Sequence, residues 1–468
     1  MPPQRGDFPL ERVEEALSRA RFVARAVVVP RGDPPRPWAV AWPDDEELRR
    51  EGFCNLYENL RFRLENAAME LPAELRPTGW TIARAPLPLR PDGTPDRDRL
   101  AREIGPRPGR CWPTSPPGRT PLPDPWRRVI AACDRVPGEA PLVREASLEF
   151  DLGLDSLDRA AFVLSLGQLL GLELGEEALA RARTLGDLVD LLEARGARPP
   201  GESRPWRVRE QAVLEGPVDG SAGLARRLRR PRLLGWPAAF ACIAAGLAAA
   251  RRGLDLRAIG LDRVDWDRRP LIVAQNHQSN LDPFLLAGVL PIHVFADAFF
   301  VGFTGYFGRG PGRIPSTLFR VQPISADPGL LPGIRSALAG LRAGRVLCIY
   351  PEGERTWRGD LQPFRRGVAW LARAASAHVV PSAIVGAYQA WPRGWGLAPH
   401  PVRILFGSPL PPPAPGESDG EFLGRLREAI AALLREGGAD PDRGDPETWA
   451  AGPPGLRGTT LAPGEGAR

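Results

Sequence analysis

Apolar side chains recur along this chain at two different spacings. In residues 148–174 they follow helical spacing, with Leu157, Ala160 and Leu164 on one face. Elsewhere they form short continuous runs, such as "LIVAQ" at 271–275, which are typical of buried strands. The run "SNLDPFLLAGVL" that soon follows this strand is typical of a helix. The pattern therefore predicts a helical part followed by a part that alternates strands and helices.

Proline- and glycine-rich stretches divide the chain. Residues 104–123 and 196–205 are predicted to be linkers without helix or strand interior, and the polar tail 437–468 is predicted to be disordered. We therefore expect a multidomain protein with three folded segments, at residues 1–103, 124–195 and 206–436. The middle segment has an excess of acidic residues and the last an excess of arginines. This difference in charge favours electrostatic docking between the two segments. The alternative is that the charged side chains of each segment are simply solvated by water.

Composition excludes several classes of function. All 62 basic residues are arginine, which is typical of a bias towards GC-rich codons. The pI of about 9.5 is therefore no sign of nucleic acid binding, and no nucleic-acid motif accompanies it. The five cysteines are scattered without C-x-x-C spacing, so we expect no metal site and no disulfide framework. The N-terminus shows no apolar signal segment, and we expect a cytoplasmic protein.

The middle segment contains the motif "LGLDSLD" at 152–158, with Ser156 at the start of a predicted helix. A serine there is often only a helix N-cap. The whole segment, with "LGLEL" some fifteen residues on, resembles acyl carrier proteins, which are four-helix bundles. That resemblance implies that Ser156 carries a 4′-phosphopantetheine arm, attached by a phosphopantetheinyl transferase. The thiol of such an arm holds an acyl group as a thioester.

The last segment places His277 and Asp282 directly after the predicted strand, in "NHQSNLDPF". Asp282 precedes a proline, so it is either the N-cap of a helix or the partner of the histidine. A second apolar strand ends in "YPEGER" at 350–355, followed by further arginines. Arginines at a strand end suit a phosphate, because the guanidinium group binds it with two hydrogen bonds.

The pair N-H-x-x-x-x-D and Y-P-E-G-x-R, at this order and distance, resembles the glycerolipid (acylglycerol-phosphate) acyltransferases, over about residues 225–410. The resemblance implies an α/β acyltransferase domain. His277 is then the general base for the acceptor hydroxyl, and Asp282 orients its imidazole. The same resemblance assigns the binding of the acceptor to four residues: Glu352, Gly353, Arg355 and Arg320.

The second block of that family is the weakest match. The arginine usual after its apolar pair is replaced by Ser325 and Ala326, which argues against an acceptor with a phosphate head group. An acceptor without a simple phosphomonoester, such as a lysophospholipid or another alcohol, stays open. The uncharged stretch 233–250 has arginines at both ends. We expect it to form an interfacial helix, which places the protein peripherally on the inner face of the cell membrane. A membrane span and a packed soluble helix are the alternatives.

The first segment resembles the small α+β C-terminal subdomain of adenylate-forming acyl ligases. The stretch 87–97 aligns with that family's L-P-x-T-x-x-G-K-x-x-R stretch, but Thr94 stands where the family has its lysine. The resemblance therefore implies an inactive subdomain, and a separate acyl ligase as the partner that loads Ser156.

Together these patterns predict an O-acyltransferase. An acyl thioester donor, on the chain's own carrier or on acyl-CoA, acylates a hydroxyl of lysophosphatidic acid or a related lysophospholipid. Two alternatives stay open. In one, the acyltransferase domain is degenerate and the chain is a membrane-anchored carrier. In the other, the acceptor is an alcohol of secondary metabolism.

Overall fold

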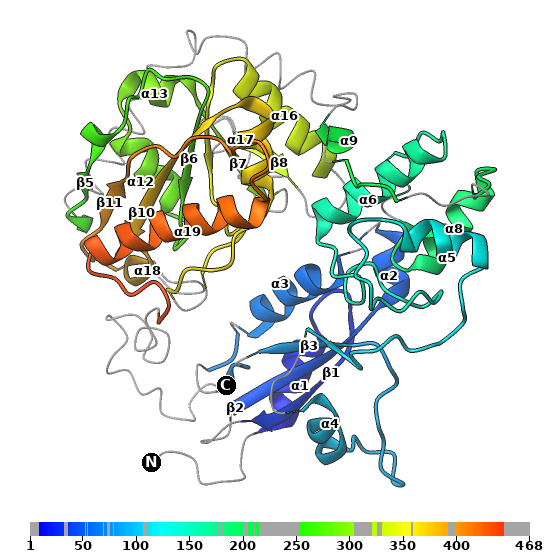
Figure 1. Ribbon diagram of the computed structural model, residues 1–468. Helices are drawn as coiled ribbons and strands as arrows, with labels where there is room; N and C mark the ends of the chain where they lie inside the picture. The colour runs from blue at the N-terminus through cyan, green and yellow to red at the C-terminus, as the bar shows by residue number, and fades with distance from the viewer. Residues whose placement is uncertain are drawn as a thin grey trace. The chain divides into compact units, whose positions relative to one another are not determined.

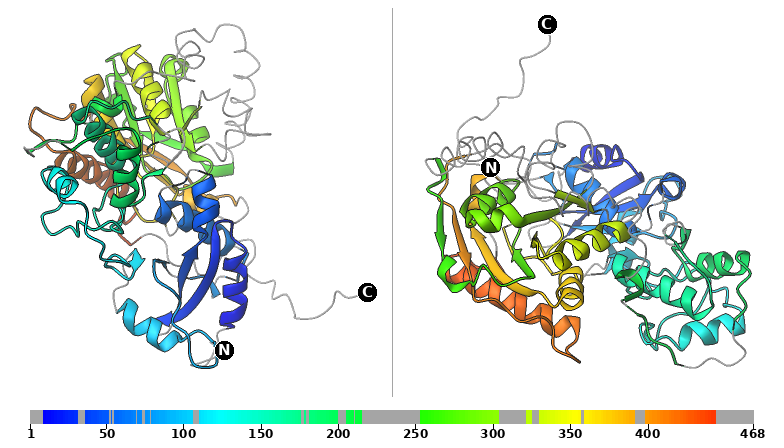
Figure 2. Two further views of the ribbon diagram at one scale, coloured as in Figure 1. Left: turned by 90° about the vertical axis from the view of Figure 1, so that its right-hand side faces the viewer. Right: turned by 90° about the horizontal axis from the view of Figure 1, so that it is seen from above.

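The structure is a computed structural model of the 468-residue chain. It describes residues 9–31, 36–105, 110–199, 205–214, 253–303, 321–324, 330–356, 359–391 and 398–443, except 52, 54, 69, 73–74, 78, 176–177, 179–180 and 210. The chain divides into two compact units, residues 1–217 with 325–331, and residues 218–324 with 332–468 (Figures 1 and 2).

The first unit begins with a four-stranded sheet in the order β1-β2-β3-β4. The strands are β1 (Val23–Arg31), β2 (Arg36–Pro43), β3 (Trp80–Ala83) and β4 (Cys111–Trp112). Side chains alternate between the two faces of β1. Val28 packs with helices α1 (Leu10–Ser18) and α3 (Leu56–Ala68), and Val27 packs with α4 (Arg97–Ile104). This α+β arrangement agrees with the expectation for the first segment.

The prediction that 104–123 is a linker without a strand is wrong for β4. Cys111 and Trp112 are buried and pair in parallel with Ile82 and Ala83 of β3. Strand β4 lies at the edge of the sheet and consists of these two residues alone. The ring of Trp112 also packs edge-on against Trp42. Apolar Cys-Trp, enclosed by prolines, was therefore enough to form an edge strand.

The carrier segment shows three helices among the described residues. They are α5 (Asp124–Ala131), α6 (Ser156–Leu169) and α8 (Leu185–Ala194). Thr184 and Asp187 form the capping box expected from sequence at the start of α8. The stretch of the remaining helix of a four-helix bundle, around residue 178, is only partly described.

The predicted domain boundary at residue 206 is also displaced. Trp206 stacks on Phe162 of α6, with ring centroids 5.7 Å apart, and its indole N–H donates to the Val129 carbonyl oxygen. Helix α9 (Gln211–Leu214) packs against α6 as well. Residues 205–214 therefore belong to the carrier and not to the acyltransferase segment.

The second unit is built on a seven-stranded sheet in the order β5-β11-β10-β6-β9-β7-β8. The strands are β5 (Arg257–Ile259), β6 (Leu271–Gln275), β7 (Ala298–Phe303), β8 (Val321–Ile324), β9 (Val346–Ile349), β10 (His378–Val385) and β11 (Arg403–Phe406). Every neighbouring pair is parallel except β10 and β11. The order makes β9 and β10 the two neighbours of β6, so three strand ends meet at one edge.

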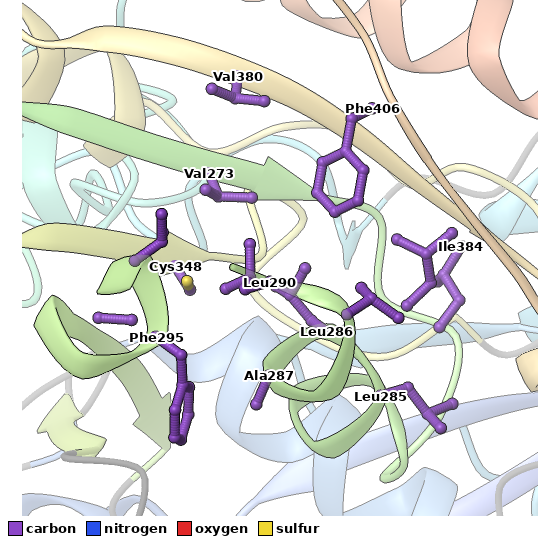
Figure 3. Close-up of a cluster of buried hydrophobic side chains, with 14 of the residues drawn as sticks. Val273, Leu285, Leu286, Ala287, Leu290, Phe295, Cys348, Val380, Ile384 and Phe406 are labelled. Atoms are coloured by element: carbon purple, nitrogen blue, oxygen red, sulfur yellow. The ribbon is translucent and has the colours of Figure 1, made fainter. Parts of the chain in front are cut away.

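Helices complete this α/β unit. They are α12 (Asp282–Val289), α13 (Ile292–Asp297), α16 (Leu330–Arg342), α17 (Gly367–Ala375), α18 (Ala387–Ala390) and α19 (Asp419–Glu436), with a short 3-10 turn at Leu261–Arg263. Figure 3 shows Leu286 of α12 beside Val273 of β6 and Phe406 of β11 in one buried apolar cluster. Helix α19 packs against β10 and α17. Buried apolar contacts of this kind fix α12, and with it the loop after β6.

Two predictions concern regions that are described only in part. In the tail predicted to be disordered, residues 437–443 are described and ordered by contacts such as the Leu361 N–H to the Pro441 carbonyl and the Arg427–Asp442 ion pair. The expected interfacial helix 233–250 lies outside the described residues. Within the parts that are described, no helix is long and apolar enough to span a membrane.

Candidate active site

His277 and Asp282 meet at the end of β6, as the sequence predicts. The Nδ1 atom of His277 lies 2.8 Å from Oδ2 of Asp282. The carboxylate is fully buried, whereas the imidazole is 18% exposed. A histidine bonded to a buried carboxylate on one nitrogen and partly exposed elsewhere suits a general base.

Asp282 is not a helix cap. The residue that precedes α12 in the cap position is Leu281, and no side chain caps this helix. The Oδ2 atom of Asp282 instead accepts the backbone N–H groups of Gln278 and Ser279, at 2.6 and 2.8 Å, from the loop before the helix. These bonds fix the carboxylate against the imidazole, so the partner reading is correct and the cap reading is wrong.

Glu352 holds the backbone of the histidine. The Oε1 atom of Glu352 accepts the His277 N–H at 2.7 Å, and its Oε2 atom accepts the Gln362 N–H at 2.8 Å. The side chain is buried, and this burial raises the pKa of the Glu352 carboxyl to about 8, against the opposing effect of the two N–H groups. Both oxygens are thus used to join the loops after β6 and β9, and the predicted acceptor contact of Glu352 stays a prediction.

Gly353 and Arg355 lie in the same loop after β9. Gly353 has φ +77°, in the left-handed region, so its identity follows from the turn. Arg355 is partly buried, and Thr356 donates its N–H to the His277 carbonyl at 2.7 Å. These bonds place the loop of Arg355 directly beside the histidine. Arg320, Ser325 and Ala326 lie outside the described residues.

Tyr350 is a site residue that sequence reasoning missed. Its ring stacks on the imidazole of His277, with centroids 4.0 Å apart and planes 16° apart. The tyrosine directly follows strand β9, which pairs with β6, and this pairing brings the two rings together. A signal was present, because Tyr350 opens the "YPEGER" motif, but its contact depends on the strand order.

Asn276 and Gln278 are two further residues that were missed. The Asn276 side chain both donates to the Ile384 carbonyl, at 3.1 Å, and accepts the Ile384 N–H, at 2.7 Å. The Gln278 side chain accepts the Tyr388 N–H at 3.3 Å. Together they bind the loop that carries His277 to the end of β10 and to α18.

Ser156 occupies the first turn of α6. The cap of this helix is Asp155, whose Oδ1 accepts the N–H groups of Leu157 and Asp158, each at 2.9 Å. The N-cap reading of Ser156 is therefore wrong. The residue is partly exposed, and its hydroxyl takes no part in the cap of α6. A helix N-terminus favours a negatively charged group, so the position fits a phosphodiester at Ser156.

The remaining candidate sites carry no cluster of ligands. In the described stretches, no group of three His, Cys, Asp or Glu residues could hold a metal ion. Thr94, in the position of the ligase lysine, donates its hydroxyl to Asp92 at 2.6 Å in an exposed turn. The adenylate-forming resemblance of this segment stays a prediction.

Two family models match the chain. Residues 257–385 match the family described as Acyltransferase, and residues 127–192 match the phosphopantetheine attachment site family. The first match contains the His277–Asp282 pair and the loop of Glu352. The second contains Ser156.

Relatives with known names match part of the chain. A yeast (Saccharomyces cerevisiae) protein named 1-acyl-sn-glycerol-3-phosphate acyltransferase is 28% identical over 203 residues, 40% of this chain and 63% of the relative. A chloroplastic protein of that name from Brassica napus is 26% identical over 156 residues, 32% of this chain and 44% of the relative. The chain thus spans less than two thirds of the length of these two relatives.

A solved structure was also found. It is the crystal structure of a 1-acyl-sn-glycerophosphate acyltransferase from Thermotoga maritima, 21% identical, with a TM-score of 0.36 over 47% of this chain and 90% of that one. The family matches, taken with the paired histidine and aspartate and the serine at the start of α6, lead to one assignment. The chain carries a domain of the acyltransferase family and, before it, a phosphopantetheine attachment domain.

Proposed function

We propose that this protein transfers an acyl group from a phosphopantetheine thioester to a hydroxyl of lysophosphatidic acid or a related lysophospholipid. The observation that carries the proposal is the 2.8 Å contact between His277 Nδ1 and the buried Asp282. The names of the relatives support a glycerolipid acceptor. The carrier domain on the same chain supports a thioester donor.

The geometry of the histidine gives it one chemical task. Asp282 accepts a hydrogen bond from the Nδ1–H group, so the basic lone pair of the neutral imidazole is on Nε2. Nε2 takes the proton of the acceptor hydroxyl while the hydroxyl oxygen attacks the thioester carbonyl carbon. The carbon–sulfur bond then breaks, and the imidazolium returns its proton to the departing sulfur. Asp282 stabilises the imidazolium, and no acyl-enzyme is needed.

The acceptor is an anion, and the loop after β9 supplies the cation for it. Arg355 is joined to the histidine loop through the Thr356 N–H and the Glu352 carboxylate. A guanidinium from this loop can bind a phosphate and so place the neighbouring hydroxyl at Nε2. Arg355 is therefore the acceptor-binding residue in this proposal.

The donor is carried by the first unit. When attached to Ser156, the phosphopantetheine arm supplies a thiol that holds the acyl group as a thioester. Asp155 ends the carrier loop and presents Ser156 at the start of α6. Because carrier and acyltransferase share a chain, the donor is supplied at a local concentration on the order of millimolar for a short tether.

The test follows the acyl group by intact mass. Ser156 is phosphopantetheinylated and acylated in vitro, and lysophosphatidic acid or lysophosphatidylcholine is added to wild-type protein and to His277→Ala. We expect acyl loss and diacyl product in the wild type, and acyl retention in His277→Ala. Equal acyl retention on both proteins with every lysophospholipid would reject the glycerolipid acceptor.

A second arm of this experiment tests the donor. Ser156→Ala is given free acyl-CoA at concentrations similar to those of the protein. We expect product to form more slowly than in acylated wild-type protein. Equal rates would show that the carrier is not the donor, while leaving the acyltransferase assignment intact.

A further inference from the structure

Helix α6 of the carrier is buried along most of its length. Every residue from Leu157 to Gly167 is buried, and these include Asp158, 6% exposed, and Arg159, 4% exposed. A helix in a small bundle normally turns one apolar stripe to the core and its charged side chains to water. Burial of the charged positions as well means that parts of the chain outside the bundle cover α6.

One cover is the segment after the bundle. Trp206 stacks on Phe162, and the Arg209 N–H donates to the Ser165 hydroxyl at 2.8 Å. This segment covers the middle of the helix. It does not reach Ser156 through any described hydrogen bond, so the start of α6 has a different partner.

That partner is the N-terminal part of the same unit. Arg84, which follows β3, makes two hydrogen bonds to Asp151 of the carrier, at 3.0 and 2.6 Å. The two side chains are only 8% and 2% exposed. A bidentate pair with so little solvent has a definite geometry, unlike the loose pairs of a protein surface.

Two further contacts extend this interface on either side. Arg183 of the carrier donates from Nε, at 3.1 Å, to the Phe53 carbonyl and from Nη1, at 3.0 Å, to Asp45. Glu149 of the carrier accepts the Leu56 and Tyr57 N–H groups at the start of α3, at 2.8 and 3.2 Å. The first two N–H groups of α3 are thus bonded to the carrier, which satisfies N–H groups that the helix itself cannot.

The same interface engages the attachment serine. The side-chain amide of Asn55, which is 3% exposed, donates to the Ser156 hydroxyl oxygen. Asn55 lies between Phe53 and Leu56, the residues that contact Arg183 and Glu149. We name the residues Asp45, Phe53, Asn55, Leu56, Tyr57 and Arg84 the docking surface.

We propose that the N-terminal part of this chain is an internal docking partner of the carrier, and that Ser156 receives its arm only when the carrier leaves the docking surface. The inference rests on the proposed function, because it takes Ser156 as the point of attachment. In that reaction the Ser156 oxygen bonds to the phosphorus of coenzyme A that carries the pantetheine. The pyrophosphate bond breaks, adenosine 3′,5′-bisphosphate leaves, and the hydroxyl proton passes to solvent. An enzyme that performs it needs the side of Ser156 that Asn55 occupies.

The test weakens docking and measures two consequences in the full chain. Arg84→Ala removes the ion pair from the docking surface, and Arg183→Ala removes the contact to Phe53 from the carrier side. Arg99→Ala, in an exposed pair with Glu103 within α4, is the matched control. Hydrogen exchange measures the protection of the Leu56 and Tyr57 amides. Intact mass measures the rate at which a phosphopantetheinyl transferase attaches the arm from coenzyme A.

We expect both interface variants to exchange the Leu56 and Tyr57 amides faster and to accept the arm roughly tenfold faster than wild type, as expected for loss of one partner of a buried contact. The amides of α8 stay protected, which shows that the carrier remains folded. Arg99→Ala behaves as wild type.

Faster exchange with an unchanged attachment rate would overturn the gating of Ser156. Unchanged exchange in both variants would overturn the docking itself. Failure of all four proteins to accept the arm would instead overturn the proposed carrier function and the gating with it.

Discussion

Glu352 joins the two loops of the candidate site. Its carboxylate accepts one N–H from His277 and one from Gln362, so the two loops of the site share a single buried acceptor. Arg355 lies three residues later in the same loop. In the proposed function the two residues of one motif have separate tasks, positioning for Glu352 and acceptor binding for Arg355.

Kinetics of two variants separate these tasks. In Glu352→Gln the amide nitrogen cannot accept an N–H, so the His277 loop shifts, and we expect kcat to fall about 10- to 100-fold with little change in KM for lysophosphatidic acid. In Arg355→Ala we expect KM to rise about tenfold or more, because a charge-assisted hydrogen bond is lost. The reverse pattern, with KM raised in Glu352→Gln, would return Glu352 to the role of acceptor ligand.

Tyr350 positions the imidazole ring through stacking. Its buried hydroxyl oxygen has no hydrogen-bond partner among the described residues, so the ring and not the hydroxyl makes the useful contact. We expect Tyr350→Phe to keep kcat within about twofold, and Tyr350→Ala to lower it about tenfold by freeing the ring to rotate. Steady-state kinetics at saturating acceptor measure both. An equal loss in the two variants would show that the hydroxyl matters and that stacking does not.

At the scale of helices and strands, sequence predicted what lies close along the chain. His277 and Asp282 are five residues apart, and a strand followed by a helix brings them together whatever the rest of the sheet does. Tyr350 and Asn276 depend instead on β9 and β10 being the neighbours of β6. Strand order follows from packing over the whole domain, so no local spacing contains it. The edge strand β4 was missed because the prolines around it indicate a linker, and its two apolar residues are too few to indicate a strand.

The docking of the carrier on α3 is expected to weaken as pH rises. Burial raises the pKa of Glu149 to about 7, in spite of Arg110 and Arg159 nearby and the two N–H groups of α3. The docked state therefore binds a proton more tightly than the open state, in which this carboxyl is exposed to water. The contribution of Glu149 to the stability of the docked state is fully present below the ordinary pKa of a glutamate and is lost as pH rises through about 7.

Hydrogen exchange between pH 6 and 8.5 measures this effect. After correction for the intrinsic exchange rate, protection of the Leu56 and Tyr57 amides should decrease with pH relative to the amides of α8. Glu149→Gln removes the titration, and its protection should not change with pH. A wild-type profile as flat as that of Glu149→Gln would show that Glu149 has no part in docking.

For the molecule as a whole, sequence predicted the order of the parts better than their limits. Ser156 and the His277 motif identify a carrier and an acyltransferase without any structure. Their boundaries were displaced at 104–123 and at 206, because Cys111, Trp112 and Trp206 are isolated apolar residues in proline-rich surroundings. Isolated tryptophans in such stretches are better read as packing positions than as parts of a linker, since burying a large ring stabilises the fold.

Because a carrier and an acyltransferase share one chain, we expect the rate of acyl transfer to be independent of protein concentration. If each chain uses its own carrier, the rate constant for acyl loss from Ser156 does not change when the protein is diluted about tenfold at saturating acceptor. A mixture supplies the comparison, in which acylated His277→Ala provides only the carrier and Ser156→Ala provides only the active site. Transfer in this mixture should be slower at micromolar protein, because the local concentration within one chain is on the order of millimolar for a short tether. It should also rise in proportion to the concentration of the second chain. Transfer that is equally fast in the mixture and in the wild type would show that the carrier serves neighbouring chains, and that the fusion has a purpose other than local supply.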